Sequence, residues 1–279
     1  MEAGNGRHVR IAQKMMASRR TLLGGMVAVG ATSTPVPSEE PVAALPWSGV
    51  PVFEDQFSLL DVSARGPDTR WTAHTPWNGD FGSAAFSDPV AGFPFTTSDD
   101  CLSITARKGE DGHWRSGLLS SVDAKGRGFS QRFGYFEARM KVPAGPGVWP
   151  AFWLATVVGN TTGVEIDIME YYGHEPAKFS SALHLWPVKK SSASKHKLLW
   201  TATPEKLADD FHLFGVNVTP NTIDFYFDRR KTHSLPTPME LNRPLGLLVN
   251  LALGSGWPID NTPNPSVLLV DYVKVFAPV

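Results

Sequence analysis

The chain has very little cysteine: Cys101 is the single one among 279 residues, which excludes an intrachain disulfide framework. No neighbouring residue suggests an activated thiol, so we interpret Cys101 as a small core residue and not as a nucleophile. The net charge of −1 implies no general attraction to nucleic acid or to an anionic membrane surface. The sequence also lacks a Cys/His cluster, an HExxH motif, an EF-hand loop, a Gly-rich phosphate loop and a Gly-x-Ser-x-Gly elbow. Nothing in it therefore requires a metal or another cofactor.

Convincing helices are missing as well. No 12-residue stretch has a helical apolar period, although Pro204–Asp210 could form one or two turns. From Trp47 onward, short runs of alternating apolar residues recur between Gly, Pro, Asp and Asn turns, without an internal repeat. This pattern predicts one all-β domain over residues 47–279: a two-sheet β-sandwich or jelly roll (concanavalin-like) with a substrate groove on its concave sheet.

The first 46 residues read differently. Residues 1–31 contain Ser18-Arg19-Arg20-Thr21-Leu22-Leu23, which resembles a twin-arginine export signal, and then a weakly apolar stretch too short to span a bilayer. Residues 32–46 hold four prolines with Ser and Glu and read as a linker. We therefore predict a bacterial protein exported to the periplasm or the medium and not attached to a membrane afterwards. The alternative is a disordered or amphipathic tail.

Three acids interrupt the apolar, β-branched run 164–172, which reads as a strand. Unpaired acids are costly on a sheet face unless they meet water or take part in chemistry. In a regular strand Glu165 and Asp167 share one face, whereas Glu170 falls on the other. One extra residue near Ile168, a β-bulge, would bring all three acids to one face. The same shift predicts Tyr172 on that face, and the following on the core face: Val164, Ile166, Ile168 and Tyr171.

Two glutamates facing a cleft are the groups that glycoside hydrolysis uses, one as nucleophile and the other as acid and then base. A retaining enzyme holds the two carboxyl groups about 5–5.5 Å apart. Four strand steps place the Cα atoms of Glu165 and Glu170 roughly 13 Å apart, and side chains that lean together shorten this gap. Asp167 lies between them and could help to separate their pKa values. A solvated acidic face and a Ca²⁺ site are the alternatives.

Aromatic residues stand close to these acids in the sequence. Trp149 and Trp153 share one face of a predicted strand, and if Phe152 is in the core, both indoles face the groove. Sugar rings stack on such surfaces, although a tryptophan on a sheet can also be simply part of the core. Trp77, in a Pro-Trp-Asn-Gly turn, is a weaker candidate for the cleft. We assign four others to the structure or the rim: Trp47, Trp71, Trp114 and Trp200.

The motif Glu-Ile-Asp-Ile-Met-Glu at 165–170, preceded by Trp-Pro-Ala-Phe-Trp-Leu at 149–154, resembles the signature of family 16 glycoside hydrolases. Its spacing resembles the bulged, laminarinase-like branch. Weaker matches extend the resemblance over about Trp47–Phe276. The resemblance implies that Glu165 is the nucleophile, that Asp167 assists it and that Glu170 is the acid/base.

Further site residues follow from the same resemblance. It implies that Trp257, in the loop after a late strand, lies at the cleft, and that Asp271 could hold a structural calcium ion. His184 stands where family members carry a histidine near the acids; it could bind substrate or a carboxylate, or it could be structural. The lysine-rich stretch 189–197 reads as a solvated loop that could instead rim the groove and favour an acidic polysaccharide.

These features together predict an exported, monomeric, retaining endo-β-glycosidase that acts on a β-glucan or a related polysaccharide. A laminarin-type 1,3-β-glucan is the favoured substrate. We expect no required cofactor, with structural calcium possible, and no nucleic-acid partner. The alternatives are a non-catalytic, lectin-like carbohydrate-binding sandwich and a transglycosylase that uses the same residues.

Overall fold

The computed structural model describes residues 47, 49–157, 159, 161–188 and 193–278. The predicted export signal and linker, residues 1–46, lie outside this part of the chain. The described residues form strands, turns and bends only, which confirms the all-β prediction. Pro204–Asp210 forms one hydrogen-bonded turn, in which the Asp209 N–H donates to the carbonyl of Lys206, and no helix; the Leu207 N–H donates to the carbonyl of Pro176. No helix in the described residues could cross a membrane.

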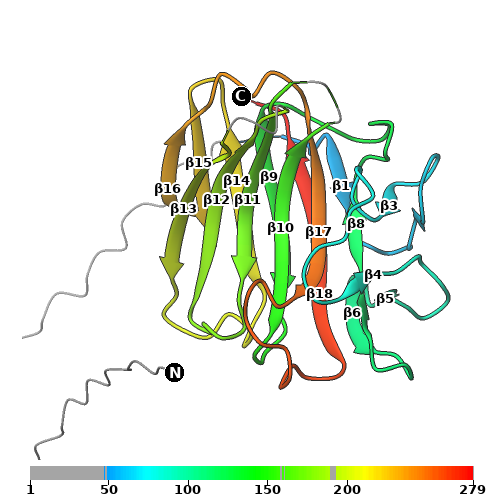
Figure 1. The fold of residues 1–279 in the computed structure, drawn as a ribbon. Helices are drawn as coiled ribbons and strands as arrows, with labels where there is room; N and C mark the ends of the chain where they lie inside the picture. The colour runs from blue at the N-terminus through cyan, green and yellow to red at the C-terminus, as the bar shows by residue number, and fades with distance from the viewer. Residues whose placement is uncertain (1–46, 48, 158, 160, 189–192, 279) are drawn as a thin grey trace, which may run out of the picture. The chain divides into compact units, whose positions relative to one another are not determined.

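Two mostly antiparallel sheets make up the domain (Figure 1). The strands of the first sheet are β2 Val62–Ser63, β3 Trp71–Ala73, β8 Leu118–Ser120, β10 Val148–Thr156, β11 Gly163–Tyr171, β12 Lys178–Trp186, β13 Lys195–Ala202 and β17 Leu245–Leu253. They run in the spatial order β13-β12-β11-β10-β17-β8-β3-β2, so the predicted acidic strand, β11, has neighbours on both sides. The outward surface of this sheet is called the groove face below.

The second sheet carries no residue of the predicted acid group. Its strands are β1 Phe53–Asp55, β4 Ala85–Phe86, β5 Phe95–Ser98, β6 Cys101–Lys108, β7 Trp114–Ser116, β9 Gly134–Lys141, β14 His212–Val218, β15 Thr222–Phe227, β16 Arg230–Pro236 and β18 Ser266–Phe276. The main order is β16-β15-β14-β9-β18-β6-β7-β4, with β1 added beside β18 and β5 beside β6. The prediction of a two-sheet sandwich is therefore confirmed.

The core lies between the sheets, where each strand contributes every second side chain. In β6, Leu102, Ile104 and Ala106 are fully buried, and the residues between them are more exposed. Cys101 begins this strand on the opposite side from Leu102 and is half-buried. The interpretation of Cys101 as a core residue was therefore wrong, because strand alternation turns its side chain outward. Burial raises the pKa of its thiol, as expected for an unactivated cysteine.

Strand β13 is the edge of the first sheet beyond β12. It begins with Lys195-His196-Lys197 and is largely exposed. Charged residues are a usual protection of an open strand edge against further strand pairing. This exposed edge strand lies beside β12, which in turn pairs with the acidic strand β11.

Candidate active site

The predicted β-bulge is present in β11. Glu165 pairs with Ala155 of β10 and Glu170 pairs with Ala151, so five residue steps on β11 match four on β10. The register with β12 shifts in the same place, between Asp167 and Glu170. Consequently Glu165, Asp167 and Glu170 share the groove face, as predicted.

The extra residue is stabilised by its neighbours. Ile168 and Met169 follow one another in the sequence, yet both are buried in the core, which a regular strand does not allow. The Ser181 hydroxyl donates a 2.8 Å hydrogen bond to the carbonyl of Ile168. Because that bond supplies the partner of a buried backbone acceptor, β12 helps to hold the bulge that orients Glu170.

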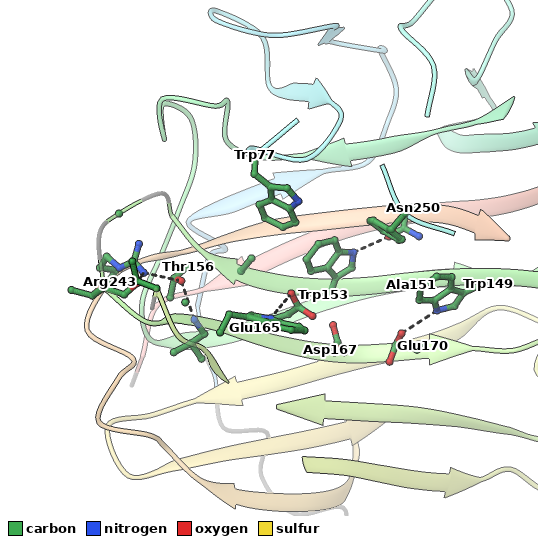
Figure 2. Close-up of a pocket in the computed structure, with 18 residues that line it drawn as sticks. Trp77, Trp149, Ala151, Trp153, Thr156, Glu165, Asp167, Glu170, Arg243 and Asn250 are labelled. Carbon is green, nitrogen blue, oxygen red and sulfur yellow. Dashed lines mark hydrogen bonds between the residues drawn. The ribbon is translucent and has the colours of Figure 1, made fainter. Parts of the chain in front are cut away.

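Each glutamate carboxylate is held by an indole. The Trp149 Nε1–H donates to Glu170 Oε1 at 3.0 Å, as Figure 2 shows, and the Trp186 Nε1–H donates to Glu165 Oε2 at 3.1 Å. The Ser180 hydroxyl lies 3.4 Å from the other oxygen of Glu170. Trp149 and Ser180 therefore direct the Glu170 carboxyl group, and Trp186 directs that of Glu165.

Burial raises the pKa of all three acids. Burial, followed by repulsion from Asp167, raises the pKa of Glu165 to about 8. Burial also raises the pKa of Glu170, against the opposing effect of the Trp149 N–H. Burial and the charge of Glu170 raise the pKa of Asp167 well above its ordinary value. The group therefore keeps a proton near neutral pH, which a pair made of one acid and one base requires.

A cavity of about 690 Å³ lies over these acids. Trp149 and Trp153 line it from β10, since Phe152 between them is fully buried in the core. Trp77 also lines it, and its ring centroid lies 5.9 Å from that of Trp153 (Figure 2). The structure thus places both predicted β10 tryptophans, and the weaker candidate Trp77, on the cavity wall.

Four lining residues with aromatic, amide or guanidinium side chains were among those missed in the sequence. Asn250 of β17 is fully buried, and its Oδ1 accepts a 2.8 Å hydrogen bond from Trp153 Nε1. Arg243, whose Nη2 lies 3.2 Å from the carbonyls of Thr161 and Thr162, closes the end of the cavity near Glu165. The other two missed residues are Phe81 and Trp186. No local signal marked them, because they come from distant segments.

Tyr172 and Trp257 lie outside the residues that line this cavity. Tyr172 follows β11 directly and stacks on Trp149, with ring centroids 6.4 Å apart. It therefore remains on the groove face, beyond Glu170. Trp257 is 44% exposed and stacks on His174 at 4.7 Å. Its predicted contact with substrate stays a prediction.

The remaining tryptophans divide between the structure and the rim. Trp47 stacks on Tyr135 of the second sheet at 3.2 Å, and Trp71 and Trp114 are buried. Trp200 of β13 is 44% exposed, and its ring lies 5.9 Å from that of Tyr172. In the lysine-rich stretch, residues 189–192 lie outside the described residues, and Lys195 and Lys197 begin β13 without lining the cavity.

His184 contacts an acid and not open space. It pairs with Glu165 across β11 and β12, and its Nε2 lies 2.8 Å from Asp167 Oδ2. Glu165, Asp167 and His184 are the one group in the described part of the chain whose ligand-type atoms lie within 4.8 Å of one another. Because Asp167 and His184 already satisfy each other by a hydrogen bond, we assign the group to proton chemistry.

Asp271 is the extra residue where the register of β18 and β9 shifts. Its Oδ2 lies 2.7 Å from Arg139 Nη1. Arg139 therefore already holds one of the two carboxylate oxygens, and the predicted calcium site at Asp271 stays a prediction.

Comparison with known proteins identifies the family of the chain. The family model described as glycosyl hydrolases family 16 matches residues 90–274, more than half of the chain. The chain therefore belongs to glycoside hydrolase family 16, which confirms the resemblance noted in its sequence.

Several relatives are similar over long stretches. "Endo-1,3-1,4-beta-glycanase EglC" of Rhizobium meliloti is 28% identical over 248 residues, 81% of this chain and 51% of that protein. "Glucan endo-1,3-beta-glucosidase A1" of Niallia circulans is 30% identical over 186 residues, 58% of this chain and 26% of that protein. The chain spans about half the length of the first of these relatives.

Solved structures show the same fold. The laminarinase catalytic domain of Thermotoga maritima superposes with a TM-score of 0.66 at 24% identity, covering 84% of this chain and 99% of that one. At this identity the likeness supports the sandwich architecture and carries no conclusion about substrate.

Proposed function

We propose that the protein is a retaining endo-β-glycosidase that hydrolyses a β-glucan or a related polysaccharide. One observation carries the proposal: the bulge of β11 brings Glu165 and Glu170 onto one face, four residue steps of β10 apart, under an aromatic-walled cavity. Membership of family 16 and the names of the relatives support it.

The mechanism follows from the groups in place. Burial raises the pKa of Glu165 to about 8, so the reactive state is the fraction of the protein in which Glu165 is ionised and Glu170 carries the proton. In that state Glu170, held by Trp149, gives its proton to the leaving glycosidic oxygen while Glu165 attacks the anomeric carbon. A glycosyl ester on Glu165 results. Glu170, now a carboxylate, then takes a proton from water, which attacks the same carbon and releases the sugar with retained configuration. Asp167 lies between the two: its charge raises the pKa of Glu165, and the charge of Glu170 raises the pKa of Asp167.

The favoured substrate is a laminarin-type 1,3-β-glucan. The open cavity with Trp77, Trp149 and Trp153 on its wall fits the apolar faces of successive sugar rings. The printed names of the relatives also include a keratan-sulfate endo-1,4-β-galactosidase and 1,3-1,4-β-glycanases. Linkage and sugar therefore have to be measured.

We propose further that the protein acts outside the cytoplasm as a monomer, after removal of residues 1–31. The twin-arginine pattern at residues 18–23 supports export. Replacing Arg19 and Arg20 by Lys together should retain the protein inside the cell. Equal amounts of both forms in the periplasm or medium would refute this part of the proposal.

The test is the release of reducing ends from laminarin, lichenan, agarose and a succinoglycan-type exopolysaccharide by residues 32–279. Variants Glu165→Gln and Glu170→Gln should lose at least about 10³-fold in kcat, because each removes one obligatory group. Glu110→Gln, an exposed loop residue, is the matched control. Proton NMR of the first anomer released reads out retention.

Other outcomes identify the alternatives. Tight binding of a glycan with no cleavage by parent or variants would favour the lectin-like sandwich. Products longer than the substrate would favour transglycosylation at the same acids. Release of the inverted anomer would refute the double displacement.

A further inference from the structure

A second histidine extends the active-site hydrogen bonds to the surface. His196 of β13 is the register partner of His184 of β12, and the two Nδ1 atoms lie 2.6 Å apart. On its other side, His184 Nε2 lies 2.8 Å from Asp167 Oδ2. Asp167 is only 5% exposed, whereas His196 is exposed at the sheet edge. Three side chains from three neighbouring strands therefore connect a buried acid to solvent.

The short nitrogen–nitrogen contact limits where protons can be. Two imidazole nitrogens at this distance repel unless one carries a proton that the other accepts. If His184 carries it on Nδ1, its Nε2 accepts a proton from the Asp167 carboxyl group. If His196 carries it, His184 Nε2–H donates to an ionised Asp167. The protonation of Asp167 is thus coupled to that of His196, two strands away.

We infer that His196 is a positioning residue that acts through His184. Together the two histidines relay protons between Asp167 and solvent. Asp167 gives its proton to His184 Nε2 while His184 Nδ1–H passes to His196 Nδ1. His196, now an imidazolium, releases its Nε2 proton to water. One proton leaves Asp167 and one reaches water, and both histidines end neutral with exchanged tautomers. The reverse sequence protonates Asp167.

The surroundings favour this route. A polysaccharide lying in the cavity would cover Asp167 and its direct access to water. The two histidines instead connect Asp167 along the sheet, from β11 through β12, to the exposed edge strand β13. Trp186 covers both rings, with centroids 5.6 Å from His184 and 5.1 Å from His196, and so holds them in register. Trp186 also binds Glu165, which connects the relay to the nucleophile.

The charged groups that face the relay within the described residues are few. Glu165, Asp167 and Glu170 approach it from β11, and the charge of His184 lowers the pKa of both glutamates. Lys195 and Lys197 flank His196 on β13 but alternate to the other face of the sheet. A proton shared by the two histidines therefore acts mainly on the three acids.

The first test needs no activity. In protein labelled with ¹⁵N at histidine, long-range proton–nitrogen spectra across pH assign the tautomer of His184 directly. We expect the tautomer of His184 to change together with the protonation of His196, and the change to disappear in His196→Gln, which cannot carry a proton onward. Lys197→Gln, on the same edge strand, is the matched control. An unchanged His184 in His196→Gln would overturn the relay.

The second test rests on the proposed function. A positive charge on His184 lowers the pKa of Glu165. A proton that His184 shares with His196 supplies that charge, and in His196→Gln it has no second ring nitrogen to share, so the pKa of Glu165, which must be ionised to attack, should rise. The acidic limb of the kcat/KM profile of His196→Gln should therefore move to higher pH by at least about half a unit, while Lys197→Gln keeps the parent profile. If kcat/KM of His196→Gln instead falls by the same factor at every pH, the role of His196 is merely structural and the inference is overturned.

The two tests separate the two proposals. A parent protein that cleaves no glycan refutes the glycosidase and leaves the tautomer experiment to decide the relay. Circular dichroism of His196→Gln confirms that the variant is folded before either test is read.

Discussion

Replacing Glu165 by Gln should stabilise the fold, and increasingly so as the pH rises. The folded protein raises the pKa of Glu165 from an ordinary value of 4.5 to about 8. A raised carboxyl pKa means that the folded state binds a proton that the unfolded chain has already lost. The contribution of this carboxyl is therefore fully favourable below about pH 4.5 and is lost as the pH rises through 8.

The magnitude follows from the size of the shift. Three and a half pKa units at about 1.4 kcal/mol each set an upper limit of about 5 kcal/mol. Glu165 is only partly buried and is coupled to Asp167, which can take up part of the proton, so we expect about 2–3 kcal/mol. A neutral amide keeps a similar shape and carries none of this penalty.

Urea unfolding of the parent and of Glu165→Gln at pH 4.0 and pH 8.5 measures the effect. The difference in unfolding free energy between the two proteins should grow by about 2–3 kcal/mol from the lower to the higher pH. Glu110→Gln, in an exposed loop, should show no such growth. A difference that is constant with pH would show that burial does not penalise the Glu165 carboxylate.

Three further predictions concern the groove face. Ser181→Ala removes the donor to the carbonyl of Ile168 and should lower the free energy of unfolding by about 1–3 kcal/mol in urea titrations. An unchanged free energy of unfolding would mean that this hydrogen bond does not stabilise the bulge. Trp153→Phe leaves the buried Asn250 amide without its donor and should cost a similar amount, measured in the same way. Ala151→Leu places a larger side chain beside Glu170 in the cavity and should lower kcat/KM at least about 10-fold with unchanged circular dichroism; full activity would place the substrate elsewhere.

Much of the acidic strand was predictable, because strand parity is a local rule. Glu165, Asp167 and Glu170 can share one face only if an extra residue enters between the last two, and that residue is present. The two-residue period also placed Phe152 inside and its two tryptophan neighbours outside. Local alternation and the cost of burying charge were sufficient for these assignments.

Two local interpretations were limited for different reasons. Cys101 was assigned to the core, but its position one step before Leu102 turns it outward, which strand alternation alone indicates. Pro204–Asp210 was allowed one or two helical turns and forms a single turn at 206–209, because the Leu207 N–H donates to the carbonyl of Pro176, in another part of the chain.

The sequence by itself determined that Glu165, Asp167 and Glu170 share a strand face, because side-chain alternation depends only on neighbours along the chain. Only the tertiary structure decided what surrounds them: Trp186 on Glu165, Asn250 behind Trp153, and His196 beyond His184. These contacts depend on which strands pair and in which register. Which strands pair, and in which register, is determined by the packing of the whole core, so no short stretch of sequence predicts it.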